Sequence, residues 1–166
     1  MKNIILTGVV FITMGLLSAC SLFPWVGGPQ VSGNITGVWP EGTSIALIGL
    51  TTDGNANYDN QTRIVDPTVA DGYVIAVPAI AAEGIYQIVA FQDGNQNSLY
   101  DQGESIASSG SNYLAFSKMD SEITFAASTF VLRRGWNGFT TDVALNTEGN
   151  PYQAEFYQNY DLIINQ

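Results

Sequence analysis

The sequence contains no histidine, one cysteine, and only five lysine and arginine residues against fifteen aspartates and glutamates. Without histidine, the usual general base near neutral pH and the commonest ligand of zinc and copper are missing. A single cysteine cannot form an internal disulfide, so packing has to stabilise the fold. A net charge of −10 repels the phosphates of nucleic acids. These absences argue against zinc or copper chemistry and against nucleic acid as a partner.

A long apolar run occurs at the beginning of the chain. It follows Lys2 and covers residues 4–17, which is shorter than the roughly 20 residues that span a bilayer. The run ends in Leu17-Ser18-Ala19-Cys20, which resembles the lipobox of bacterial lipoproteins. The resemblance implies that residues 1–19 are a cleaved signal peptide and that Cys20 carries palmitate-type acyl chains. The alternative is an ordinary secretory signal that leaves Cys20 as a free thiol.

Acylated Cys20 would make the lipid bilayer the first partner of this protein. Ser21 follows the cysteine, and in organisms that sort lipoproteins by this position it implies the outer membrane. We therefore expect an exported protein that is lipid-anchored to the cell envelope. Residues 20–30 form a tether of at most about 35 Å, and residues 31–166 are enough for a single domain.

This domain is predicted to be all-β, because β-branched and aromatic runs alternate with turn residues and no helical periodicity occurs. Segment 44–51 is apolar on both faces, which predicts burial on both sides. Asn137-Gly138 predicts a tight hairpin turn. In the last strand the alternation places Tyr160, Leu162 and Ile164 inside together with Phe156, and leaves Tyr157 and Asp161 toward solvent. The expected strands are 31–39, 44–51, 73–77, 85–91, 113–116, 122–134, 139–145 and 156–164, which is typical of a single antiparallel sandwich of seven or eight strands.

One segment has the spacing of a calcium loop. Residues 93–104 place oxygen-bearing groups at the first, third, fifth, seventh, ninth and twelfth positions, as a hard cation with six to eight oxygen ligands requires. The sharp-turn position, normally glycine, is Ser98, which costs about 1 kcal/mol if the backbone is left-handed there. We place this loop in a β-hairpin or at a sandwich edge; the alternative is a plain polar turn. The expected calcium ligands are Asp93, Asn95, Asn97, the carbonyl of Leu99, Asp101 and Glu104.

With its flanks, this segment resembles a pattern in bacterial surface β-sandwiches of the transthyretin-like or carboxypeptidase-regulatory-like type, and the loop itself is EF-hand-like. The likeness rests on Gly84-Ile85-Tyr86, Val89-Ala90-Phe91 and the acidic loop ending in Gly103-Glu104. It implies an Ig-like or transthyretin-like sandwich with calcium as its cofactor. It also implies a structural or adhesive module more than an enzyme.

A second segment begins with the same alternation but has Ile64 at its twelfth position. Without a bidentate carboxylate there, a plain turn is favoured over a second ion site. The secondary metal candidates in this segment are Asp53, Asn55, Asn57 and Asp59.

The leading hypothesis is a calcium-stabilised structural or interaction module with an envelope protein as partner, and without enzyme activity. An alternative is a carbohydrate- or peptide-binding module whose stacking face is formed by Trp136, Tyr152, Phe156, Tyr157 and Tyr160, with Arg133 and Arg134 beside the tryptophan. A carboxylate-based hydrolase is the weaker alternative, because nucleophile motifs are absent. Its candidate acids are Glu83, Glu104, Asp120, Glu122, Asp142 and Glu155.

Overall fold

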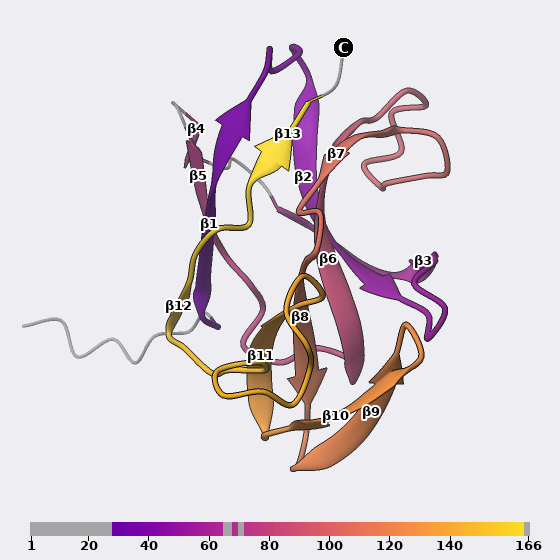
Figure 1. Cartoon of the computed structure of the whole chain (residues 1–166). Helices are drawn as coiled ribbons and strands as arrows, with labels where there is room; N and C mark the ends of the chain where they lie inside the picture. The colour runs from indigo at the N-terminus through magenta and orange to yellow at the C-terminus, as the bar shows by residue number, and fades with distance from the viewer. Residues whose placement is uncertain (1–27, 65–67, 70–71, 165–166) are drawn as a thin grey trace, which may run out of the picture.

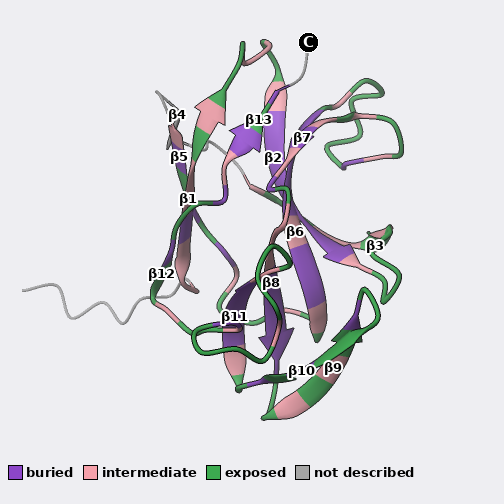
Figure 2. Cartoon of the chain, viewed as in Figure 1, coloured by how far each residue is buried: buried purple, intermediate pink, exposed green. Residues whose placement is uncertain are grey.

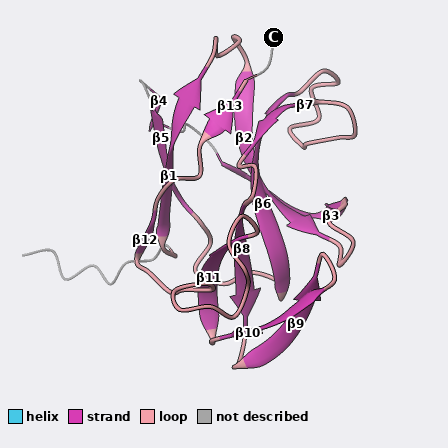
Figure 3. Ribbon diagram, in the orientation of Figure 1, coloured by secondary structure: helices cyan, strands magenta, loops and turns pink. Residues whose placement is uncertain are grey.

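A computed structural model describes residues 28–64, 68–69 and 72–164 (Figure 1). The expected signal segment, Cys20 and most of the expected tether lie outside these residues. Every regular element in the described part is a strand (Figure 3), and no helix there is long and apolar enough to cross a bilayer. The strands are β1 (Gln30–Thr36), β2 (Thr43–Leu50), β3 (Ala56–Ile64), β4 (Thr68–Val69), β5 (Gly72–Ala76), β6 (Gly84–Gln92), β7 (Ser105–Ser108), β8 (Asn112–Ser117), β9 (Ser121–Phe125), β10 (Ser128–Leu132), β11 (Gly135–Thr140), β12 (Phe156–Tyr157) and β13 (Leu162–Ile163).

These strands form two main sheets and a separate hairpin. One sheet has the order β12-β1-β5-β4, with β13 also paired to β1, and the other has the order β11-β8-β6-β2-β3, with β7 paired to β6. Strands β9 and β10 pair only with each other. The all-β, sandwich-like fold class is therefore confirmed. Not every pair is antiparallel, because β1 pairs in parallel with both β12 and β13.

The larger sheet is covered on both faces. Its inner face meets the smaller sheet in the main core, where Leu47, Ile88 and Leu114 pack with Val31 and Tyr73. Its outer face carries two further apolar clusters, one under the β9–β10 hairpin and one beside β3. Figure 2 shows the resulting buried stripe along β2 and β6. The predicted burial of segment 44–51 on both faces is confirmed, because Ile45 and Leu47 face the main core while Ala46 and Ile48 face the outer cluster.

The predicted strand over 122–134 is wrong as a single element. The chain reverses at Ala126 and Ala127, whose φ angles are 48° and 64°, and β10 runs back along β9. The sequence gives no turn signal here, because both turn positions are alanine and not the glycine or asparagine that usually adopt positive φ. The reversal brings Phe125 and Phe130 onto Phe139 of β11.

The hairpin predicted at Asn137-Gly138 is also wrong, because both residues lie inside β11 and neither has a positive φ. The Asn137 side chain instead closes the preceding turn: its amide nitrogen donates to the carbonyls of Arg133 and Gly135, at 2.7 and 3.0 Å. Gly138 is required by close packing. A Cβ there would lie 2.7 Å from Cδ1 of Tyr157.

The C-terminal segment is two short strands, β12 and β13, and not one continuous strand. Tyr160, Leu162 and Ile164 are buried as expected, but the predictions for two neighbours are reversed: Tyr157 is fully buried and Phe156 is 39% exposed. The break between the strands resets the alternation, because Asn159 adopts a φ of 68°. Other boundaries differ too, since residues 37–39 and 141–145 are outside strands, and β3, β4 and β7 were not expected.

Candidate metal loop and pocket

The segment 93–104 connects β6 to β7 and folds as a compact loop at one end of the larger sheet (Figure 1). Strands β6 and β7 pair in antiparallel fashion, and the N–H of Gln92 donates to the carbonyl of Glu104, 3.1 Å away. The expected position of this loop in a β-hairpin is therefore confirmed. Its first and last candidate ligands, Asp93 and Glu104, are close to the sheet.

Both end carboxylates accept backbone N–H groups of the loop. Asp93 accepts from Asn97 at 3.0 Å and from Ser98 at 2.7 Å. Glu104 accepts from Gly94 and Asp101, both at 2.9 Å. Asp93 thus holds the middle of the loop, and Glu104 joins its beginning to its end. Each oxygen keeps a second lone pair that these contacts do not use.

The middle candidate ligands meet one another. Asp101 Oδ2 accepts hydrogen bonds from the side-chain amides of Asn95 and Asn97, at 2.8 and 2.6 Å. The amide oxygens of the two asparagines point to backbone N–H groups two residues further on, those of Asn97 and Leu99. All six expected ligand residues are therefore joined by hydrogen bonds within the loop, through their side chains or their backbone N–H groups.

The backbone of the loop is left-handed at two non-glycine positions. Gln96 has a φ of 60° and Ser98 a φ of 67°. Ser98 occupies the sharp-turn position where a glycine is usual, so the strain expected from the sequence is present. Leu99 is 47% exposed, whereas the next residue, Tyr100, is buried against Phe91. Burial raises the pKa of the Tyr100 phenol.

The candidate ligands are all oxygen atoms, as calcium requires, but they come from three kinds of group. Within the described ranges, no three His, Cys, Asp or Glu side chains gather closely enough to hold a metal ion by themselves. The loop offers three carboxylates, two amide oxygens and one carbonyl, all of them oxygen ligands of the type that calcium prefers. A calcium ion bound to Oδ2 of Asp101 would have to replace the amide N–H groups of Asn95 and Asn97 as partners of that oxygen.

The second Asp/Asn segment takes a different shape. Asp53 and Asn55 lie in the turn between β2 and β3, where the hydroxyl of Thr51 accepts from the N–H of Asn55 at 3.2 Å. Asn57 and Asp59 belong to β3 itself. The four residues are exposed and spread along a turn and a strand.

Three of the candidate hydrolase acids serve as acceptors at separate turns. Glu83 accepts from the N–H of Lys118 at 3.0 Å, and Asp120 accepts from the N–H of Arg134 at 2.8 Å. Asp142 accepts from the hydroxyl of Ser111. Each of these carboxylates therefore connects its own turn to a distant one.

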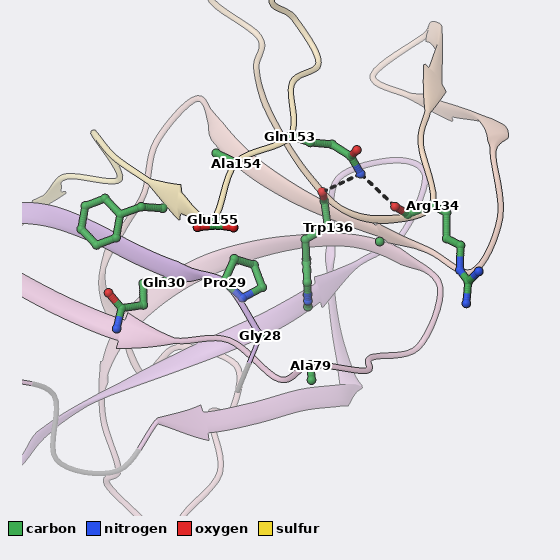
Figure 4. Close-up of a pocket in the computed structure, with 11 residues that line it drawn as sticks. Gly28, Pro29, Gln30, Ala79, Arg134, Trp136, Gln153, Ala154 and Glu155 are labelled. Carbon is green, nitrogen blue, oxygen red and sulfur yellow. Dashed lines mark hydrogen bonds between the residues drawn. The ribbon is translucent and has the colours of Figure 1, made fainter. Parts of the chain in front are cut away.

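A pocket of about 840 Å³ opens where the described chain begins (Figure 4). Arg134 and Glu155 line it with Trp136 and Phe156. The Trp136 indole N–H donates to the carbonyl of Pro78 at 2.8 Å, and only 6% of this residue is exposed. The amide nitrogen of Gln153 donates to the carbonyls of Arg134 and Trp136. The remaining lining residues are Gly28, Pro29, Gln30, Ala79, Gly135 and Ala154.

The five aromatic residues of the expected stacking face do not share one open surface. Tyr157 and Tyr160 are buried, and their hydroxyls donate to backbone carbonyls of Trp136 and Tyr113. Tyr152 and Phe156 remain at 36% and 39% exposure. The contributions of Pro29, Gln30 and Gln153 to the pocket had no signal in the sequence, because tertiary contacts alone bring them together.

Comparison with known proteins adds no relative: no family model, no curated protein and no solved structure shows significant similarity to this chain.

Proposed function

We propose that this chain is a lipid-anchored protein of the cell envelope whose sandwich domain is a non-enzymatic structural or interaction module stabilised by calcium at residues 93–104. The observation that carries the ion proposal is the closure of the loop by its two end carboxylates, Asp93 and Glu104, around oxygen-bearing residues at calcium-loop spacing. An envelope protein is the expected partner of the module.

The anchor proposal rests on the lipobox-like sequence and on the short distance along the chain between Cys20 and the first residue of the folded domain. Gly28 already belongs to the domain, because its N–H donates to the carbonyl of Val77 at 3.0 Å. Seven residues therefore separate Cys20 from the folded part, a reach of at most about 25 Å. Labelled palmitate should enter the protein in a bacterial host and should not enter the Cys20→Ala variant. Equal labelling of the wild type and the variant would contradict the anchor proposal.

Calcium titration tests the ion proposal. In the full chain purified in detergent, calcium at ten times its dissociation constant should add about 1.4 kcal/mol of stability, which corresponds to a rise of roughly 4 °C in the unfolding midpoint. Glu104→Gln should abolish the rise. Glu148→Gln, which neutralises an exposed acid on a different loop, should leave it unchanged.

Magnesium at the same concentration separates a calcium site from general charge screening, because magnesium demands a tighter octahedral geometry. A midpoint that responds equally to both ions, or equally in the Glu104 and Glu148 variants, would contradict the ion proposal.

The pocket supports a second candidate function, binding of a peptide segment of a partner protein. It presents one guanidinium and one carboxylate beside an exposed phenyl ring, which suits the mixed polar and apolar surface of a peptide. The nearly buried indole of Trp136 leaves little ring face for a sugar, so a peptide fits better than a carbohydrate. Peptides selected on the wild-type protein should lose binding to Arg134→Ala and keep binding to Arg133→Ala, whose side chain is outside the pocket lining. Equal loss in both would contradict this candidate.

A further inference from the structure

The loop at residues 93–104 is held by a residue of β3, the strand that contains the end of the second Asp/Asn segment. Gln61 of β3 reaches the loop at Tyr100, where its side-chain oxygen accepts the backbone N–H at 2.7 Å and its side-chain nitrogen donates to the backbone carbonyl at 3.2 Å. One carboxamide thus satisfies both backbone groups of Tyr100, as a neighbouring strand would. The same nitrogen also donates to the carbonyl of Tyr58 at 2.7 Å.

A bulge in β3 makes this contact available. Ile48 of β2 is opposite Gln61, whereas the next residue, Gly49, is opposite Asn57, so residues 58–60 are extra on the β3 side. Gly49 permits the bulge, because a Cβ there would lie 2.4 Å from Nδ2 of Asn60. Within the bulge, the ring of Tyr58 packs on that of Tyr100, with centroids 5.6 Å apart.

Tyr100 lies between two of the proposed calcium ligands, the carbonyl of Leu99 and the carboxylate of Asp101. Leu99 itself is 47% exposed. Fixing both backbone groups of Tyr100 therefore restricts where its two neighbours can lie. The support comes from outside the loop, from a strand about forty residues earlier in the chain.

We infer that Gln61 is a positioning residue for calcium at residues 93–104 and that the bulged edge of β3 is coupled to ion binding. This inference rests on the proposed calcium function. In this interpretation, residues 53–64 position the loop at residues 93–104 and do not form an ion site of their own. Because coupling is reciprocal, bound calcium should also restrain β3.

Terbium, which replaces calcium and is excited through nearby tyrosines, measures the effect directly in the full chain in detergent. Gln61→Met keeps the side-chain length and removes both hydrogen bonds to Tyr100. Terbium affinity, and the calcium affinity measured by displacement of terbium, should each fall about ten-fold, because ion binding would then have to order the backbone of Tyr100 and its two neighbours. Gln61→Asn, which is one methylene too short to reach, should match it.

Gln87→Met is the control, because Gln87 makes a comparable bond to the carbonyl of Gly110 at 2.8 Å, in another loop. Its terbium affinity should equal that of the wild type. Circular dichroism without metal confirms that each variant is folded. Amide exchange in β3 should slow with calcium in the wild type and in Gln87→Met, but not in the Gln61 variants.

The outcomes separate the two proposals. If the wild type binds neither terbium nor calcium, the ion function and the coupling are both overturned. If the wild type binds and folded Gln61→Met binds with the same affinity, only the coupling is overturned. A ten-fold loss in Gln61→Met and Gln61→Asn, without loss in Gln87→Met, supports the coupling.

Discussion

Residues 53–64 and 93–104 begin with the same Asp/Asn alternation and fold in different ways. The later segment closes on itself, because the carboxylate of Glu104 accepts N–H groups from both halves of the loop. The earlier segment has Ile64 at the matching position, which pairs with Ile45 and packs against the main core. It therefore becomes a short turn followed by strand β3.

The two segments differ at the last residue of the pattern, and each fold follows the chemistry of that residue. A carboxylate at the twelfth position gathers the backbone N–H groups around it, whereas an isoleucine is drawn into the sandwich core, and the residues before it are extended as a strand. The two segments are in contact, because Gln61 of β3 accepts a hydrogen bond from Tyr100 in the loop.

Alkaline pH should have the largest effect on stability. The tyrosines with the most strongly raised pKa values lie in the sandwich interior and not in either of the two segments. Burial raises the pKa of Tyr157 to about 12 and those of Tyr73 and Tyr160 further. A raised pKa in the folded state means that stability is complete below pH 10, the unfolded value, and is lost as pH rises toward the folded value. Each such tyrosine should cost about 1.4 kcal/mol per pH unit above pH 10.

Urea unfolding at pH 8, 10 and 11 measures this loss, and tyrosinate absorbance should appear together with unfolding. Unfolding stability that is unchanged between pH 10 and 11 would contradict the prediction.

Replacing the eighth residue of each segment should have the next largest effect. Tyr100→Ala removes a buried ring that packs on Phe91 and Tyr58, and should cost about 3 kcal/mol of unfolding free energy. Asn60→Ala removes one hydrogen bond from its side-chain amide to the Tyr86 hydroxyl, and should cost about 1 kcal/mol. Denaturant titration of the two variants gives both values. Equal losses would mean that the two segments are held by the sheet to the same degree.

Exchanging glycine between the left-handed positions should have the smallest effect. Gly54 has a φ of 81° in the turn of the earlier segment and Ser98 a φ of 67° in the loop. Gly54→Ala should cost about 1 kcal/mol, whereas Ser98→Gly should gain up to about 0.5 kcal/mol, because relief of strain exceeds the added freedom of the unfolded chain. Unfolding midpoints without calcium test both signs. Destabilisation by Ser98→Gly would show that its side chain contributes more than its backbone strain costs.

Local patterns in the sequence were sufficient where neighbours along the chain decide the outcome. The apolar residues on both faces of segment 44–51 predicted a strand covered on both sides. The strand-like flank 85–91 placed the loop 93–104 in a β-hairpin or at a sandwich edge. Both are confirmed, because alternation along a strand and loop closure depend on residues close in sequence. The lipid anchor at Cys20 and the calcium ligands remain predictions.

Tertiary structure decided what depends on distant residues. Asn137-Gly138 has the composition of a turn, yet Gly138 is glycine because the ring of Tyr157 occupies the space a side chain would need. Phe156 and Tyr157 exchange their expected faces because the parallel pairing of β12 with β1 orients them. The pocket and the Gln61 contact join segments distant in the chain. The sequence by itself determined an all-β chain with one closed acidic loop, and tertiary structure decided which faces meet, because burial requires a partner surface that local periodicity does not encode.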